Sequence, residues 1–161
     1  MFTGIICEWF FNNPRGSTWD RESKTLSFFG DGSKEFIYCT TNDLAAYSVE
    51  AVTAPGAENG GYVRVESFRL TPEQIVREYE AASGGGVAAQ TKRVGSLEDA
   101  EKMLLKARTE IDAMEFEKYI GLSYVVHVLR GTWDFEASDV KRFGGVRQTK
   151  LREWFEMHPE L

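Results

Sequence analysis

Two strongly marked helix starts constrain what this chain can fold into. Thr71 precedes Pro72 and is followed three residues later by Gln74. Ser96 is followed three residues later by Asp99. In both cases the hydroxyl can accept a hydrogen bond from a free backbone N–H of the first turn, while the later side chain bonds back to the cap. Each start follows a short predicted strand, so the chain alternates strand and helix.

The remaining elements follow from hydrophobic periodicity and from breaker residues. An apolar run at 3–12 predicts a strand that continues into a loop at 12–16. The pattern at 25–39 predicts two strands joined as a hairpin by Gly30-Asp31-Gly32-Ser33, because glycines supply the positive φ of a tight turn. The other predicted strands cover 62–68 and 87–93, and the predicted helices cover 42–52, 72–82, 97–111, 116–129 and 151–155.

The order of these elements predicts an α/β fold. Strands come early and alternate with helices, whereas the last third of the chain is nearly all helix. This order indicates part of an α/β sheet that carries a helical C-terminal lobe. No internal repeat, low-complexity tract or linker interrupts the sequence, so a single domain covering 1–161 is expected.

Composition and length argue against several classes of protein. A formal net charge of -6 over 161 residues does not suit a general binder of nucleic acid or of membrane surfaces. No apolar run approaches the roughly 20 residues that span a bilayer, and the start lacks a secretory signal pattern, so a cytoplasmic location is expected. Cys7 and Cys39 each lie in an apolar run, which predicts buried free thiols rather than a disulfide.

The letters of a dinucleotide-binding motif occur at Gly84-Gly85-Gly86-Val87-Ala88-Ala89. That motif binds a cofactor where it follows a strand and opens a helix, because the pyrophosphate contacts free N–H groups at the helix start. Here the glycines end one predicted helix and precede a predicted strand. The sequence therefore predicts no cofactor-binding residues in this chain.

Other catalytic patterns are missing from the sequence as well. No tyrosine has a lysine four residues later, a pairing that lowers the phenol pKa for proton donation. His127 and His158 have no His or Cys neighbour at a metal-ligand spacing, so no metal site is expected. His127, in an apolar stretch, is predicted to be satisfied by a hydrogen bond.

The candidate substrate-binding residues are Trp9, Phe10, Phe11 and Asn12, where the first predicted strand meets its loop. In open α/β sheets, ligands bind beyond the carboxyl ends of strands. An aromatic run that ends in Asn can line an apolar pocket with one polar contact. Packing in the core is the alternative role for these rings.

A basic cluster near the C-terminal end has two interpretations. It is either a solvated helix face and loop or a site for an anionic ligand or an acidic partner. Its members are Lys141, Arg142, Arg147, Lys150 and Arg152.

Several stretches together resemble the NmrA-like family of atypical short-chain dehydrogenases, which are relatives of isoflavone reductases. TLSFFGDGSKEFIYCTTNDLAAYSVEAV is similar to the family's G-D-G turn, strand, Thr-x-x-Asp segment and helix. RVESFRLTPEQIVREYEAASG and VGSLEDAEKML resemble the strand and helices that follow, and LREWFEMHPEL resembles the family's ending. The resemblance covers nearly the whole chain, although no single motif is diagnostic.

The resemblance implies the C-terminal half of a two-part enzyme. Complete members begin with a Gly-rich strand-turn-helix for NADP(H), and the reductase branch has a catalytic Lys upstream of the region matched here. The expected fold is thus a partial Rossmann-like sheet of late strands with a helical, substrate-side C-terminal lobe. Trp9 to Asn12 match the start of the family's substrate loop, Thr41 to Ala45 match a strand-to-helix turn, and no catalytic residue transfers.

Three classes of function follow from this resemblance. The first is a truncated member of an oxidoreductase lineage, in fungal secondary metabolism like many relatives, that performs no NADP(H)-dependent hydride transfer alone. The second is a regulatory module that binds a small molecule or a protein. The third is a repurposed, cofactor-free isomerase or cyclase that uses an aromatic pocket.

A partial sheet also raises a question of assembly. Without upstream strands, its edge would present unpaired backbone N–H and C=O groups together with apolar surface. We therefore expect a homodimer joined near residues 3–10. Neither nucleic acid nor membrane is an expected partner.

Overall fold

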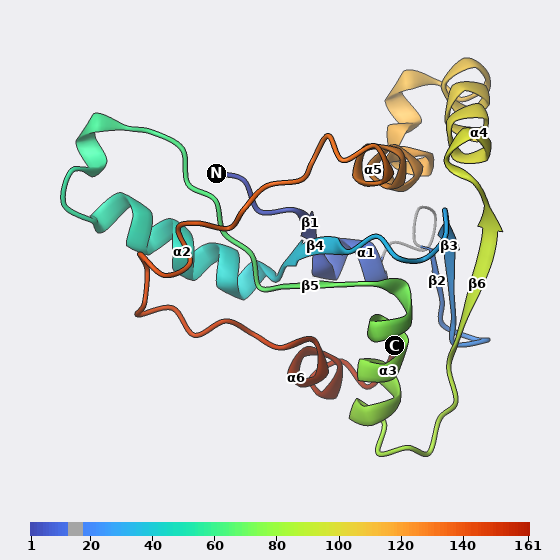
Figure 1. Cartoon of the computed structure of the whole chain (residues 1–161), viewed down its shortest axis with the longest axis horizontal. Helices are drawn as coiled ribbons and strands as arrows, with labels where there is room; N and C mark the ends of the chain where they lie inside the picture. The colour runs from blue at the N-terminus through green and yellow to red at the C-terminus, as the bar shows by residue number, and fades with distance from the viewer. Residues whose placement is uncertain (13–17) are drawn as a thin grey trace.

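The computed structural model describes residues 1–12 and 18–161 and contains two three-stranded sheets flanked by helices (Figure 1). Most of the predicted loop at 12–16 lies outside the described residues. The first sheet has the order β1-β4-β5, and the second has the order β2-β3-β6. Helices α4 and α5 lie on one side of the sheets, and α3 and α6 lie on the opposite side.

In the first sheet, the parallel pair is β1 and β4, with Ile5 opposite Tyr38 and Ile6 opposite Cys39. Strand β5 runs antiparallel on the other edge of β4. In the second sheet, β3 pairs antiparallel with β2 and parallel with β6. The strands are β1 (Ile5–Ile6), β2 (Trp19–Asp20), β3 (Thr25–Phe29), β4 (Phe36–Cys39), β5 (Phe68–Leu70) and β6 (Gln90–Gly95).

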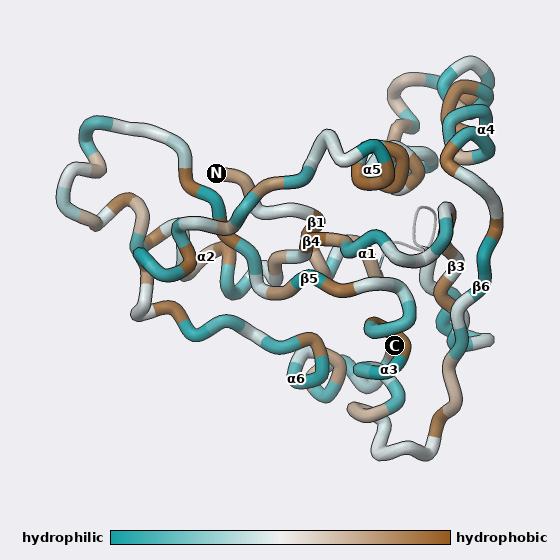
Figure 2. Tube along the Cα trace, viewed as in Figure 1, coloured by the Kyte–Doolittle hydropathy of each residue, from teal (hydrophilic) through white to brown (hydrophobic). Residues whose placement is uncertain are grey.

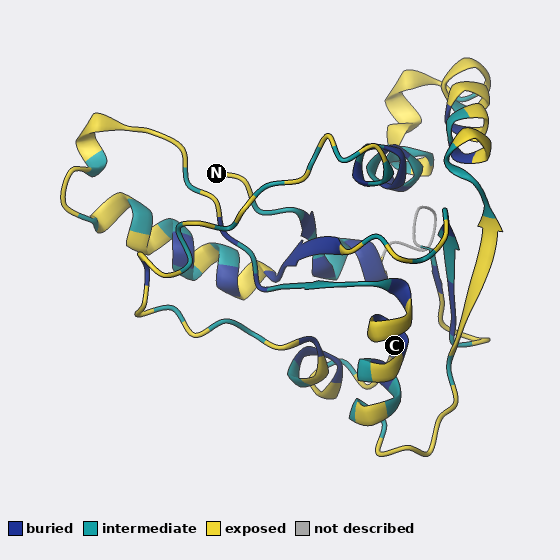
Figure 3. Ribbon diagram, in the orientation of Figure 1, coloured by how far each residue is buried: buried dark blue, intermediate teal, exposed yellow. Residues whose placement is uncertain are grey.

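Beyond Gly95 the described chain contains helices and no strand, as predicted. Figure 2 shows that most of α5 is hydrophobic, and Figure 3 shows that this helix is largely shielded while the outer face of α4 is exposed. The α/β prediction with a helical C-terminal part is confirmed. The helices are α1 (Cys7–Asn12), α2 (Thr41–Thr53), α3 (Pro72–Ala82), α4 (Leu97–Glu110), α5 (Ile120–Leu129) and α6 (Leu151–Glu156), with 3₁₀ turns η1 (Ala57–Asn59) and η2 (Ala113–Lys118).

The two capped helix starts predicted at Thr71 and Ser96 are confirmed. Both halves of the capping box form at Thr71 with Gln74, and both form at Ser96 with Asp99. At α2 the Thr40 hydroxyl accepts from the Asp43 backbone N–H. These caps depend only on residues within one turn, so the sequence alone specifies them.

The strand predicted at 3–12 is wrong beyond Ile6, because α1 begins at Cys7. The buried residues of α1 are Cys7, Phe10 and Phe11, which have the helical spacing i, i+3, i+4. A short apolar run is compatible with either conformation, and burial of all three side chains on one face selects the helix.

The hairpin predicted at 25–39 is also wrong. Both strands form, but β3 and β4 belong to different sheets. Each already has partners on both edges, β2 and β6 for β3 and β1 and β5 for β4. Gly30 and Gly32 do adopt positive φ, +84° and +81°, and they lead the chain from one sheet to the other.

Three predicted boundaries shift. The strand expected at 62–68 forms only at its end, as β5, and its earlier part makes a single bridge between Phe2 and Arg64. The strand expected at 87–93 starts three residues later, as β6. The helix expected from 116 begins at Ile120, because a 3₁₀ turn precedes it.

The largest core cluster is aromatic and joins α1, β4, α3 and α6. Phe11 is 1% exposed, and its ring centroid lies 5.3 Å from that of Trp154 and 5.1 Å from that of Phe155. Tyr79 of α3 meets Phe155 edge-on at 5.2 Å. Edge-to-face contacts of this kind add to the free energy already gained by removing apolar surface from water.

Cys7 and Cys39 are buried free thiols, as predicted. None of the helices in the described part of the chain has the length and apolar character that a bilayer span requires. Strand β1 forms one edge of its sheet, which is the position that the predicted homodimer requires. The homodimer itself and the single-domain organisation stay predictions.

Replacing Phe11 with Ala should destabilise the protein strongly, because the cavity would open at the junction of four elements. We expect a loss of about 3–5 kcal/mol in the free energy of unfolding, measured by urea denaturation. The matched control is Phe116→Ala on a ring that is 54% exposed, with an expected change within about 0.5 kcal/mol. Similar losses in both variants would contradict this account of the core.

Candidate functional site

Helix α1 starts at the carboxyl end of β1 and is anchored there by Glu8. The Glu8 carboxylate accepts from the Thr41 backbone N–H at 3.0 Å and from the Thr41 hydroxyl at 2.9 Å. It also accepts from the indole N–H of Trp154 at 3.3 Å. A carboxylate is favourable at the start of α2, where backbone N–H groups are free and the helix dipole is positive. Sequence reasoning missed Glu8 because its partners lie far along the chain.

The four predicted substrate-binding residues do not share one pocket. Phe10 and Phe11 are buried in the main core. Asn12 is exposed, and its side-chain oxygen accepts from Arg21 at 2.6 Å. Trp9 is half-buried and meets Tyr124 edge-on, with ring centroids 5.4 Å apart. The helical turn of α1 explains this divergence, because successive side chains point in different directions around a helix.

Two of the four residues, Phe11 and Asn12, border a hollow of about 760 Å³ between the end of α1 and the second sheet. Its other apolar walls include Trp19, Phe29 and Met103. The binding role predicted for Trp9, Phe10, Phe11 and Asn12 stays a prediction.

Trp9 begins a row of aromatic side chains that leads away from α1. Tyr124 of α5 contacts Trp133 at 4.8 Å between ring centroids, and Trp133 stacks on His127 at 5.4 Å with planes only 9° apart. All of these side chains are half-buried. His127 also bonds the Thr132 hydroxyl at 3.1 Å, which confirms that this histidine is satisfied by a hydrogen bond.

Trp133 also lines a hollow of about 450 Å³, which we call the aromatic hollow. Phe2 faces this hollow and is fixed by its backbone, which donates to the Val63 carbonyl at 2.7 Å and accepts from Val65 at 3.0 Å. The Phe2 ring lies 6.3 Å from that of Phe135, between centroids. The residues lining the hollow are Met1, Phe2, Thr3, Gly4, Arg64, Thr132, Trp133, Asp134 and Phe135.

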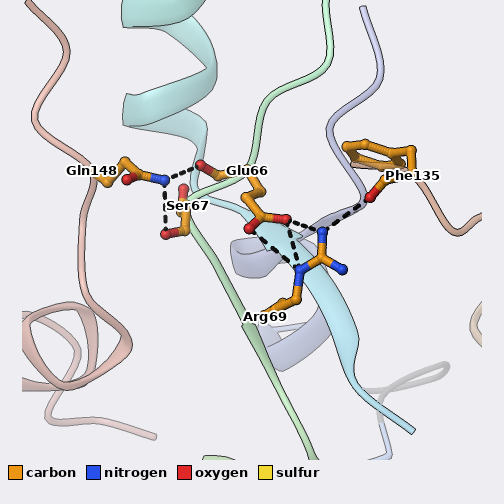
Figure 4. Close-up of polar contacts among 5 residues, drawn as sticks. All are labelled: Glu66, Ser67, Arg69, Phe135 and Gln148. Carbon is orange, nitrogen blue, oxygen red and sulfur yellow. Dashed lines mark hydrogen bonds and ion pairs between the residues drawn. The ribbon is translucent and has the colours of Figure 1, made fainter. Parts of the chain in front are cut away.

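The wall of the aromatic hollow at 132–135 has no regular secondary structure of its own, and Arg69 holds it (Figure 4). The Arg69 guanidinium donates to the Phe135 carbonyl at 3.0 Å and to the Glu66 carboxylate at 2.7 Å. The hydrogen bond to Glu66 raises the pKa of Arg69 above its usual value, so this guanidinium stays charged. Lys34 pairs with Asp134 of the same segment. These contacts position the wall without any ligand.

A second polar network holds the following segment against α2. The buried Asp43 carboxylate accepts from the Ser67 hydroxyl at 2.5 Å and from the Thr149 hydroxyl and backbone N–H at 2.7 and 2.9 Å. Gln148 donates to the Glu66 carbonyl at 2.7 Å, as Figure 4 shows. Asp43 therefore has a structural role, because a buried carboxylate needs these hydrogen-bond donors.

The buried thiols and phenols are not activated nucleophiles. Burial raises the pKa of Cys39 to about 11 and of Tyr47 to about 12, and raises the pKa of Cys7 and Tyr38 well above their ordinary values. At neutral pH these groups are protonated, and a protonated thiol is a poor nucleophile.

The glycines at 84–86 do not fit a dinucleotide. They follow the end of α3 and precede β6, as predicted, and Gly84 and Gly85 have positive φ of +66° and +74°. The next element is the strand β6, so no helix start lies directly after them to present free N–H groups to a pyrophosphate. This glycine run therefore offers no binding site for the pyrophosphate of NADP(H).

The basic cluster near the C-terminal end is mostly engaged in ion pairs. Arg147 pairs with Glu153 at 2.8 Å, and Arg152 pairs with Glu78 at 3.1 Å. Arg142 approaches Asp139 at 3.6 Å. These pairs favour a solvated surface over a site for an anion.

Comparison with known proteins finds similarity to a reductase and to an isoflavone reductase homolog. No family model matches the chain. A bifunctional pinoresinol-lariciresinol reductase from Linum corymbulosum is 27% identical over 169 residues, covering 98% of this chain and 47% of that protein. An isoflavone reductase homolog from Nicotiana tabacum is 32% identical over 89 residues, covering 52% of this chain and 29% of that protein.

Solved structures of this kind share the fold. An isoflavone reductase superposes with a TM-score of 0.67 at 17% identity, covering 97% of this chain and 50% of its own. A triphenylmethane reductase from Citrobacter sp., complexed with NADP(H), superposes with a TM-score of 0.65 at 20% identity. The match covers 97% of this chain and 51% of that chain. The chain spans about half the length of the proteins that it matches along its whole length.

The raised pKa values predict that the protein loses stability in alkali. Each of the buried thiols and phenols is neutral when protonated, and its pKa in the folded protein lies above its pKa in the unfolded chain. The resulting stabilisation is complete below the ordinary thiol pKa of 9.0 and is lost as the pH rises toward 11, the pKa of folded Cys39. Urea denaturation from pH 8 to pH 11 checks this. A free energy of unfolding that stays constant above pH 9 would contradict it, and Cys39→Ala should reduce the loss.

The Arg69 anchor can be tested against another arginine ion pair. Arg69→Met should lower the free energy of unfolding and speed amide hydrogen exchange at 132–137, because the Phe135 carbonyl loses its donor. Arg77→Met is the matched control, since Arg77 forms an exposed ion pair with Glu73 on α3. Equal exchange rates in the two variants would show that Arg69 does not hold the wall.

Proposed function

We propose that this chain, which is related to the isoflavone reductase-like (NmrA-like) proteins over about half of their length, forms the substrate-side part of such a fold and binds an aromatic small molecule. The observation that carries the proposal is the aromatic hollow. Its volume of about 450 Å³ is within the usual range for small-molecule sites, roughly 300–1,000 Å³. Its rings are positioned by backbone and side-chain bonds before any ligand arrives.

The partial exposure of these rings supports a binding role. Phe2 is 46% exposed, and Trp133 and Phe135 are half-buried. Aromatic residues held at a concave surface offer large, rigid contact area at low entropic cost. The row from Trp133 through Tyr124 to Trp9 extends this surface to one of the residues proposed from sequence. A planar aromatic molecule is the ligand that suits such walls.

Hydride transfer is not part of what we propose for this chain alone. Three of the four proteins named above are reductases and the fourth is an isoflavone reductase homolog, and the triphenylmethane reductase is complexed with NADP(H). In this chain the glycine run has the wrong neighbours for a pyrophosphate. We propose that the chain binds its aromatic ligand without taking up NADP(H). Truncation of a longer enzyme, a cytoplasmic location and a role in fungal secondary metabolism stay predictions.

Between the alternative classes, the hollow favours a binding module over a cofactor-free isomerase or cyclase. Its lining residues include one carboxylate, Asp134, and this side chain already pairs with Lys34. General acid-base chemistry needs a group with a pKa near the working pH within reach of the ligand. A regulatory module that binds without turnover is thus the second candidate.

Calorimetric titration with 2-naphthol, a compact planar aromatic molecule, tests the proposal. We expect saturable binding to the unmodified protein and a loss of about tenfold in affinity for Trp133→Ala, which removes the largest ring of the hollow. Phe116→Ala is the control, because its exposed ring does not line the hollow, and it should bind normally.

Titration with NADPH completes this test. No saturable binding in the micromolar range is expected. Micromolar binding of NADPH would overturn the cofactor part of the proposal, and absence of any 2-naphthol binding would overturn the aromatic part.

A further inference from the structure

We infer that the aromatic hollow selects an aromatic ligand that carries a carboxylate, and that Arg64 is the residue that recognises this anion. The inference rests on the proposed aromatic binding and adds the chemical class of the ligand. It depends on where the Arg64 guanidinium lies and on what it does not contact.

Two hydrogen bonds fix the backbone of Arg64, which is one of the residues that line the hollow. Its N–H donates to the Asp139 carboxylate at 2.9 Å, and its carbonyl accepts from the Asp139 N–H at 3.1 Å. The neighbouring residues Val63 and Val65 bond the backbone of Phe2. The base of the Arg64 side chain is therefore fixed next to the Phe2 ring.

The guanidinium of Arg64 differs from that of every other arginine in the described part of the chain. It makes no hydrogen bond and no ion pair, and its contact is with the Phe2 ring, 5.9 Å from the centroid. The other arginines of the described residues bond carboxylates, carbonyl oxygens or, for Arg108, the Ser123 hydroxyl, and Arg69 bonds Glu66 and Phe135. All five N–H donors of Arg64, a residue that lines the hollow, thus remain without a partner among the described residues.

This arrangement matches a carboxylate better than a neutral group. A guanidinium binds a carboxylate through two parallel N–H···O bonds, and charge assistance strengthens both. The cation–π contact with the Phe2 ring restricts where the Arg64 guanidinium can lie. This restriction lowers the entropic cost of binding a carboxylate. The one carboxylate of the lining, Asp134, is paired with Lys34, so its charge is largely offset.

The lining and the volume of the aromatic hollow limit what the rest of the ligand can be. Phe2 and Phe135 form one side of the hollow, and Trp133 belongs both to the hollow and to the aromatic row. A volume of about 450 Å³ suits one small molecule rather than a peptide. The ligand class is therefore a planar aromatic acid, with its ring among these side chains and its carboxylate at Arg64.

Calorimetry with 2-naphthoate and 2-naphthamide separates charge from shape, because the two probes have nearly the same size. The unmodified protein should bind 2-naphthoate about tenfold more tightly than 2-naphthamide. Arg64→Gln should remove this difference by weakening 2-naphthoate alone. Arg77→Gln is the matched control on a distant exposed arginine and should leave both affinities unchanged.

The negative outcomes separate the role of Arg64 from aromatic binding itself. If the acid and the amide bind equally, or if Arg64→Gln weakens both, aromatic binding stands and the role of Arg64 is overturned. If neither probe binds, the proposed function fails together with this inference. If neither binds and Trp133→Glu converts a dimer to a monomer in sedimentation, the occupant of the hollow is a second copy of the chain.

Discussion

The packing of Phe11 against Trp154 and Phe155 is the interaction on which the rest of the structure depends. It brings the first helix and the last helix of the chain together, and β4 and α3 join them through Tyr38 and Tyr79. Glu8 completes this junction by bonding both Trp154 and the start of α2. The aromatic packing and the Glu8 carboxylate act at the same place, where the parallel strands β1 and β4 end. Together they position α1 and α2, the helices that follow these strands.

Polar anchors then position the segment that forms the wall of the aromatic hollow. Residues 132–150 cross the molecule largely without regular secondary structure, so their backbone groups need partners elsewhere. Arg69 donates to the Phe135 carbonyl, and Asp43 accepts from the Thr149 backbone N–H. The Gln148 side chain adds an anchor by donating to the Glu66 carbonyl. The aromatic hollow is a consequence of these bonds, since they hold Trp133 and Phe135 opposite the chain start.

The family resemblance drawn from residue stretches is confirmed by the reductase relatives, and the α/β fold is confirmed by the structure. The candidate site was harder to predict. Trp9 does reach an aromatic row, but Phe10 and Phe11 are core residues and Asn12 lies at a different hollow. The hollow we propose is built from three separate segments, and no motif in the sequence links them.

The sequence by itself determined the features that depend on a few neighbouring residues. These are the capped helix starts at Thr71 and Ser96, the glycine turn after β3, the free thiols and the ordering that rules out the Gly84 run as a cofactor loop. Only the tertiary structure decided that 7–12 is a helix, that β3 and β4 lie in separate sheets, and that Arg64 stands unpaired beside Phe2. Caps and turns are local energies, whereas strand pairing and side-chain burial depend on partners that only the folded chain brings within reach.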